Sequence, residues 1–188
     1  MPRSSDSHPD VVLLKDDQHE IPEGWDVFVH LRGWLYFFNS SLKLVTDQDI
    51  RDPRLYELFS SQASKLTPSE WPEGMEVLFQ VNKSGNIDYL LAVNHKHCTA
   101  VSQSIEDCFD EAIESLDIHA LNRRRRLYWN YLWGHPSHAP CPSRALPDAS
   151  DALNWYYTDN LVSGSRCNAP FSKVECEELM GVLKDMQR

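Results

Sequence analysis

The stretch that decides the fold of the N-terminal part is IPEGWDVFVHLRGWLYFFNSSLKLVTDQDIRDP, residues 21–53. It is rich in aromatic and β-branched residues, which favour strands, and Gly, Pro, Asn and Ser interrupt it at turns. These interruptions predict short strands at residues 25–31, 34–39 and 43–45, joined as an antiparallel meander. A sheet of three such short strands needs additional packing to be stable.

The same stretch carries a set of residues at characteristic positions. They are Ile21, Pro22, Gly24 and Trp25 at the start, Gly33 at the first turn, Tyr36, Phe37 and Asn39 in the middle strand, Thr46, and Pro53 at the close. With these residues the stretch resembles a WW domain. The resemblance implies a small three-stranded antiparallel sheet in which Trp25, Phe37 and Pro53 pack together as a structural clasp. It also implies a fold that serves recognition.

WW domains bind proline-rich segments between two aromatic walls, because flat rings suit a preformed polyproline helix. The resemblance implies that Tyr36 is the first wall. Ile50 stands where the family has a second Trp, and Ser40 stands where it usually has a His. We therefore expect a weakened proline-peptide groove whose ligand-binding residues are Tyr36, Trp34 and Ile50.

Strand and helix signals alternate after this stretch. Residues 54–63 carry apolar groups at helical spacing and predict a short helix. Residues 72–79, PEGMEVLF, repeat the character of residues 22–29, PEGWDVFV, which predicts a second, degenerate meander up to residue 102. Two explanations fit this similarity: an internal repeat, or the general pattern of antiparallel hairpins.

From residue 104 onward the apolar period changes from two to 3.6, which predicts a helical region. An apolar stripe from Ile105 to Leu116 predicts its first helix. Ser172 and Glu175 form a capping box at the start of the last helix. Further helices are expected at residues 119–133, 150–161 and 172–186.

These patterns predict an α+β protein with one or two small WW-like sheets followed by a helical C-terminal region. The expected parts are a disordered tail over residues 1–20, a WW-like domain over 21–53, a short helix with a second meander over 54–103, and a helical region over 104–188.

Charge argues against a nucleic-acid partner. The 188 residues include 28 acidic and 18 basic side chains, a formal charge of −10, which repels phosphate backbones. The one basic cluster, residues 123–126, has two interpretations: a phosphate-contacting patch, or surface arginines that pair with the acidic segment before them. The net charge favours the second, and we expect no DNA or RNA partner.

Sequence motifs for catalysis, such as a nucleotide loop or a nucleophile elbow, are absent. We therefore expect no enzymatic activity, cofactor or metal. The alternative is a metal-dependent domain, because two groups offer zinc-type ligands. These groups are His95, His97 and Cys98, and then His135, His138 and Cys141.

Four prolines between residues 136 and 147 favour an extended connection. One hypothesis is that this connection folds back onto the aromatic sheet as an internal ligand. The expected function is accordingly non-enzymatic protein interaction, with a proline-rich peptide, another protein, or this segment of the same chain as the partner.

The sequence predicts a cytoplasmic or nuclear location, because it shows neither a signal peptide nor a run of about 18 apolar residues. A longer pattern, with Asp-Ile-Arg-Asp-Pro at residues 49–53 and arginines with aromatic residues at 123–133, is similar to uncharacterised fungal proteins. Many of these continue into membrane-spanning segments. The second alternative is therefore the cytoplasmic head of a longer membrane-anchored protein, with its anchor beyond Arg188.

Overall fold

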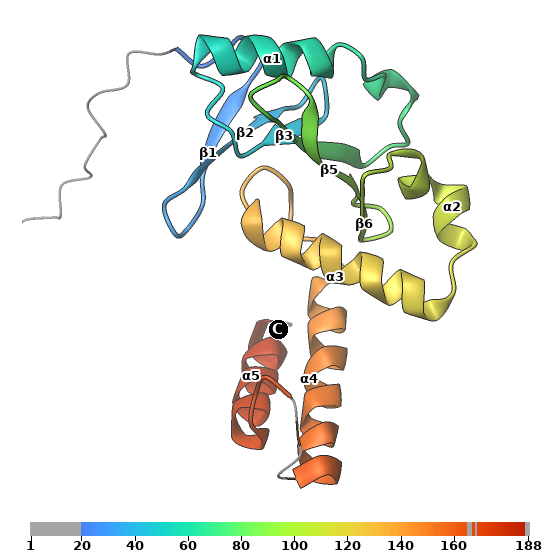
Figure 1. The fold of residues 1–188 in the computed structure, drawn as a ribbon. Helices are drawn as coiled ribbons and strands as arrows, with labels where there is room; N and C mark the ends of the chain where they lie inside the picture. The colour runs from blue at the N-terminus through green and yellow to red at the C-terminus, as the bar shows by residue number, and fades with distance from the viewer. Residues whose placement is uncertain (1–19, 165–166, 168, 187–188) are drawn as a thin grey trace, which may run out of the picture.

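The structure is a computed structural model that describes residues 20–164, 167 and 169–186. It is an α+β fold built around a single mixed sheet of six strands in the order β1-β2-β3-β4-β5-β6. Helix α1 lies on one face of the sheet and α3 on the other, while α4 and α5 extend away from this body (Figure 1). The strands are β1 (Asp26–Val29), β2 (Leu35–Asn39), β3 (Leu44–Thr46), β4 (Met75–Val81), β5 (Ile87–Asn94) and β6 (Thr99–Ser102).

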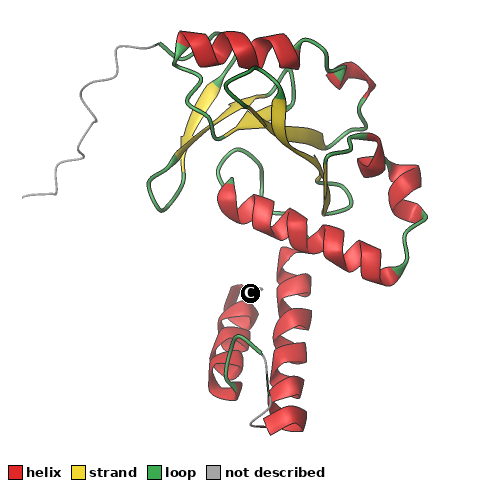
Figure 2. Cartoon of the chain, in the orientation of Figure 1, coloured by secondary structure: helices red, strands yellow, loops and turns green. Residues whose placement is uncertain are grey.

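The helical segments fall between and after the strands, and the last three helices follow the final strand; Figure 2 draws the helices in red and the strands in yellow. The predicted tail lies outside the described residues, except for Glu20. The helices are α1 (Pro53–Ala63), α2 (Asp110–Glu114), α3 (Ile118–Gly134), α4 (Ala145–Ser163) and α5 (Lys173–Met186), with single 3-10 turns η1 (Pro68–Glu70) and η2 (Glu106–Cys108).

The three predicted N-terminal strands form, but the expected small separate sheet is replaced by a larger one. β1, β2 and β3 pair antiparallel as one meander, and β4, β5 and β6 pair antiparallel as a second. β3 and β4 then pair in parallel, with Leu44 opposite Val77 and Val45 opposite Leu78. This pairing satisfies backbone groups that an isolated β3 edge would expose, and α1 provides the crossover that parallel strands require.

The face under α1 is packed by aromatic and aliphatic side chains. Phe59 of α1 stacks on Phe79 with ring centroids 4.1 Å apart, and its edge meets Trp25 at 5.4 Å. Phe37 is buried in the same cluster. Pro53 is exposed and begins α1, a position that suits its fixed φ. The expected clasp is therefore built differently, because Phe59 supplies the ring against Trp25.

The predicted helix over residues 105–116 is interrupted. Phe109 has extended backbone angles, φ −74° and ψ 155°, and separates η2 from α2. The carbonyl of Cys108 accepts a hydrogen bond from Asn94 Nδ2 at 3.0 Å. Cys108 and the partly buried Phe109 pack in the apolar cluster of the α1 face. Tertiary packing thus overrides the helical periodicity here.

The last two helices form a hairpin, hereafter the α4–α5 hairpin. α4 begins five residues earlier than predicted, because Pro147 is tolerated in a first helical turn. The capping box of α5 is confirmed: Ser172 N donates to Glu175 Oε2 at 2.8 Å, and Glu175 N donates to Ser172 Oγ at 3.3 Å. Among the helices of the described residues, none has both the length and the apolar character needed to cross a membrane.

Candidate functional site

The three residues expected to bind ligand do not form one surface. Tyr36 is fully buried on the α3 face of the sheet, whereas Ile50 is fully buried in the cluster on the α1 face. Only Trp34 is partly exposed, at 37%, and it stacks on His30 with ring centroids 3.5 Å apart. The sheet itself separates Tyr36 from Ile50, because neither side chain reaches the other face.

A segment far along the chain covers Tyr36. The backbone N–H of Ser137 donates to the Tyr36 hydroxyl at 2.9 Å, and His138 Nδ1 lies 3.3 Å from the same oxygen. The ring of His135 meets Tyr36 edge-on at 5.0 Å. The covering residues belong to the proline-rich connection between α3 and α4. Its serine and histidines make the hydrogen bonds and ring contacts to Tyr36, whereas the hypothesis of an internal ligand assigned the contacts to prolines.

Glu76 lies at the centre of the polar contacts on this face. It occupies a strand in which six of seven residues are buried, and its own exposure is 5%. Its Oε1 is 2.5 Å from the Tyr131 hydroxyl, 2.7 Å from His95 Nε2 and 3.0 Å from His138 Nε2. These four residues, with Tyr36 and Tyr128, are called the Glu76 cluster below.

Electrostatics keep this carboxylate ionised. Burial by itself raises the pKa of Glu76, but hydrogen bonds from His138 and His95 outweigh it and hold the pKa well below its ordinary value. Burial raises the pKa of Tyr131 far above 10, and the adjacent Glu76 charge adds to this effect. The phenol therefore stays protonated and donates to the carboxylate.

The ring nitrogens of the two histidines that face away from Glu76 contact tyrosine hydroxyls. His95 Nδ1 is 3.0 Å from the Tyr128 hydroxyl, and His138 Nδ1 is 3.3 Å from the Tyr36 hydroxyl. If each phenol donates to Nδ1, the Nε2–H of each ring donates to the carboxylate. The Tyr36 oxygen still accepts from Ser137 N–H. The cluster thus joins β2, β4, β5, α3 and the following segment in one network.

An open hollow of about 460 Å³ borders the Glu76 cluster. Tyr131 and His135 line it, together with Asp47 and residues of β4, β5 and α3, whereas Glu76 and His138 are not part of its lining. His135 Nε2 is 2.8 Å from Asp47 Oδ1, and its Nδ1 is 2.9 Å from the Tyr131 carbonyl oxygen. These contacts fix the segment after α3 to the loop that follows β3.

Histidines of the two His/Cys groups contact carboxylate oxygens. His95 and His138, one from each group, approach the same Glu76 oxygen, and His97 Nε2 turns to Asp110 Oδ1 at 3.1 Å. Within the part of the chain that the structure describes, no group of three or more His, Cys, Asp or Glu side chains is arranged to hold a metal ion.

The basic cluster is partly engaged with the chain itself. Arg124 donates to the carbonyl of Asp107, and Arg124 and Arg125 are half-buried. Arg123 and Arg126 are exposed. The four side chains therefore do not form a single basic face.

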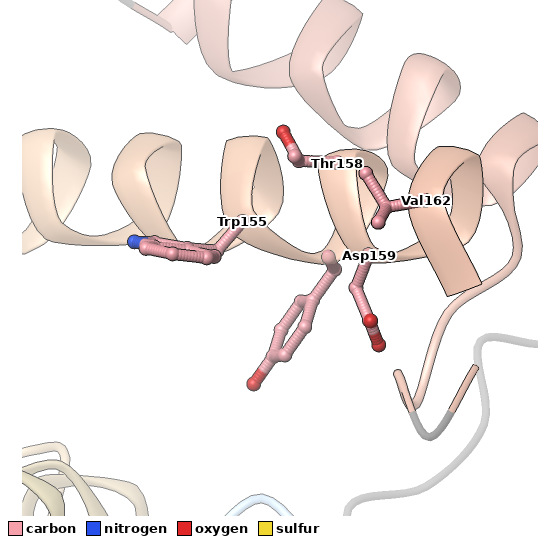
Figure 3. Close-up of a pocket in the computed structure, with 5 residues that line it drawn as sticks. Trp155, Thr158, Asp159 and Val162 are labelled. Atoms are coloured by element: carbon pink, nitrogen blue, oxygen red, sulfur yellow. The ribbon is translucent and has the colours of Figure 1, made fainter. Parts of the chain in front are cut away.

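Large apolar side chains reach solvent on the α4–α5 hairpin. Trp155 is 74% exposed and Val162 is 81% exposed. They line a hollow of about 360 Å³ with Tyr156, Thr158 and Asp159, and Figure 3 shows the labelled side chains projecting from α4 around it. Further exposed apolar residues on the hairpin are Leu161, Phe171, Val174, Leu179, Val182 and Met186.

A second hollow of about 290 Å³ lies between the two helices of the hairpin, hereafter the hairpin groove. Tyr156 borders both hollows, so the two adjoin at this residue. The lining of the groove includes Ala149, Ala152 and Tyr156 of α4 and Leu179, Val182 and Leu183 of α5.

No family model, curated protein or solved structure matches this chain. Its residues alone therefore carry the functional argument. The WW resemblance singled out Tyr36, and the metal alternative singled out His95 and His138, but sequence reasoning missed Glu76. Glu76 left a signal: it is the one charge in MEVLFQV, an otherwise apolar run that is typical of a strand covered on both faces.

Proposed function

We propose that this chain is a non-enzymatic protein-interaction protein. In this proposal a WW-like meander belongs to a larger sheet, the chain's own segment closes the aromatic face of that meander, and the α4–α5 hairpin makes the contact with partners. The observation that carries the proposal is the placement of aromatic side chains. Tyr36 is buried beneath Ser137 and His138, while Trp155 stands 74% exposed on the hairpin.

Exposure of large apolar groups supports a binding role. Singly scattered apolar residues on a surface are ordinary, but a continuous apolar surface marks an interaction site. The hairpin groove gives the hairpin such a surface, with apolar lining residues from both of its helices. Aromatic residues such as Trp155 and Tyr156 are also the types that contribute most to binding energy at interfaces.

Burial of Glu76 and His138 supports a structural role for these two side chains. A general acid or base must come within hydrogen-bond reach of its substrate. The side chain of His138 is 1% exposed and that of Glu76 is 7% exposed. Each donor in the cluster already has an acceptor inside it, which suits a network that fixes α3 and its following segment to the sheet.

Site-specific photocrosslinking tests this function. A photoreactive phenylalanine analogue replaces Trp155 in the full chain, which is irradiated in an extract of its source cells. We expect a discrete crosslinked species that excess wild-type protein competes away and Val182→Asp protein does not. The control carries the analogue at Leu31, an exposed turn position. Equal labelling from the two positions, or equal competition by the two proteins, would contradict the proposal.

A further inference from the structure

We infer that the hairpin groove binds an amphipathic helix that is basic on its polar side. This inference rests on the proposed function and names the chemistry of the partner. The groove runs between two antiparallel helices, and its described lining is apolar or aromatic. Such a groove accepts the apolar face of a third helix, which inserts side chains at i, i+3, i+4 and i+7.

The spacing of the apolar groups along α5 fits this mode. Leu179, Val182, Leu183 and Met186 stand at i, i+3, i+4 and i+7, so they fall on one side of the helix. The groove takes in the first three, and Met186 continues their line at 65% exposure.

The net charge of the hairpin indicates which charge the polar side of the partner helix carries. Together α4 and α5 carry seven acidic and two basic side chains, a net −5, although the whole chain carries −10. None of the described residues that line the groove is charged, and Glu178 stands one turn from Val182 along α5. A second copy of this chain would place −5 against −5, whereas a basic helix meets a hairpin of opposite net charge.

The probe is a synthetic peptide of leucine and lysine, about 18 residues long, which is enough to form a helix once bound. Its leucines follow the i, i+3, i+4, i+7 pattern. It is titrated calorimetrically into the full chain, beside a peptide with glutamate in place of lysine and a scrambled peptide of the same leucine and lysine content. We expect the patterned leucine–lysine peptide to bind one per chain and both others to bind at least about tenfold more weakly.

Matched variants locate the binding. Val182→Asp places a charge in the groove, and Leu31→Asp adds the same charge at a turn that is 94% exposed. We expect Val182→Asp to weaken binding about tenfold or more and Leu31→Asp to leave it unchanged. Each variant adds a negative charge, so a purely electrostatic attraction would strengthen in both. Equal binding by the two variants would overturn the inference.

Two further outcomes would also overturn it. Tight binding of the glutamate peptide would remove the charge argument. A wild-type dimer in light scattering, together with a monomeric Val182→Asp chain, would assign the groove to a second copy. If the peptide fails to bind the groove while position 155 still gives a specific crosslink, that result would reject the basic helix as the partner and leave the proposed interaction function standing.

Discussion

The two faces of the sheet are stabilised by different kinds of interaction. Under α1, Phe59 packs between Phe79 and Trp25 in a cluster of aromatic and aliphatic groups. Under α3, apolar packing surrounds the Glu76 carboxylate and the hydrogen bonds it accepts from His95 and His138. Buried apolar area and close packing stabilise the first face. The second face also needs the hydrogen-bond partners of Glu76 to be present.

This difference shows what the fold needs in order to bury the charge of Glu76. Apolar burial is insensitive to pH, because it involves no protons. A buried carboxylate is stabilising only while it is ionised and hydrogen-bonded. We therefore expect acid, or the loss of a single hydrogen-bonding atom, to lower the stability contributed by the α3 face. The substitutions below compare the two faces, and then compare both with the hairpin.

The largest effect is expected on the apolar face. Phe59→Ala removes a fully buried ring and leaves a cavity between Phe79 and Trp25. We expect the free energy of unfolding to fall by about 3–5 kcal/mol, by the same amount at pH 7 and at pH 5.5. Urea unfolding measures both values, with Leu31→Ala as the exposed control. A loss below about 1 kcal/mol would contradict this packing.

The next effect is expected at the centre of the polar face. Glu76→Gln keeps the shape but removes the charge that three donors share, which should cost about 2–3 kcal/mol at pH 7. The lowered pKa of Glu76 means that its stabilisation is present above the ordinary glutamate pKa of about 4.3 and is lost as pH falls below it. The gap between the wild type and the variant should therefore narrow by about 1 kcal/mol at pH 3.5.

Urea unfolding at the two pH values checks this dependence. Glu73→Gln is the matched control, because Glu73 is exposed on the same approach to β4, and it should change stability by less than about 0.5 kcal/mol. A gap that stays constant or widens on acidification would show that the Glu76 carboxylate is not held ionised by the cluster.

A smaller effect is expected where the polar face meets its covering segment. Tyr36→Phe deletes the oxygen that accepts from Ser137 N–H and contacts His138, and we expect a loss of about 1–1.5 kcal/mol. Combined with His138→Ala, the double variant should show a coupling of about 0.5–1 kcal/mol. Tyr89→Phe, at a partly exposed tyrosine, is the control. Strict additivity would mean that Tyr36 and His138 do not act together.

The smallest effect on stability is expected on the hairpin. Trp155→Ala removes a side chain that is 74% exposed, so the free energy of unfolding should change by about 0.5 kcal/mol or less. Thermal unfolding monitored by circular dichroism measures this change. A loss above about 2 kcal/mol would mean that the indole packs within the chain, and would remove it from the proposed contact surface.

Local sequence patterns predicted much of the fold. Strands β1 to β3, helix α1, the position of α3 and the capping box of α5 all follow from turn residues, apolar periodicity or short-range side-chain contacts. The parallel pairing of Leu44 with Val77 could not be predicted in this way, since it joins residues from two meanders that each look complete. Likewise, nothing local marks Phe109 as the break between η2 and α2.

The candidate site was harder to predict for the same reason. Ser137 lies 101 residues from Tyr36, and Tyr131 lies 55 residues from Glu76, so only the folded chain brings these pairs together. The WW resemblance implied that Tyr36 lines a weakened peptide groove, whereas in the structure Tyr36 is buried beneath Ser137 and His138. The lone charge of Glu76 in an apolar strand was the one local signal of a buried polar network.

Amide hydrogen exchange at Ser137, measured by NMR on the full chain at pH 7, tests the central claim most directly. The claim is that the chain's own segment closes the aromatic face over Tyr36. If so, the Ser137 N–H exchanges at least about a hundredfold more slowly than in an unstructured peptide, and Tyr36→Phe removes most of that protection. Exchange at the unstructured rate in the wild type would show that the face is open, and would contradict the account.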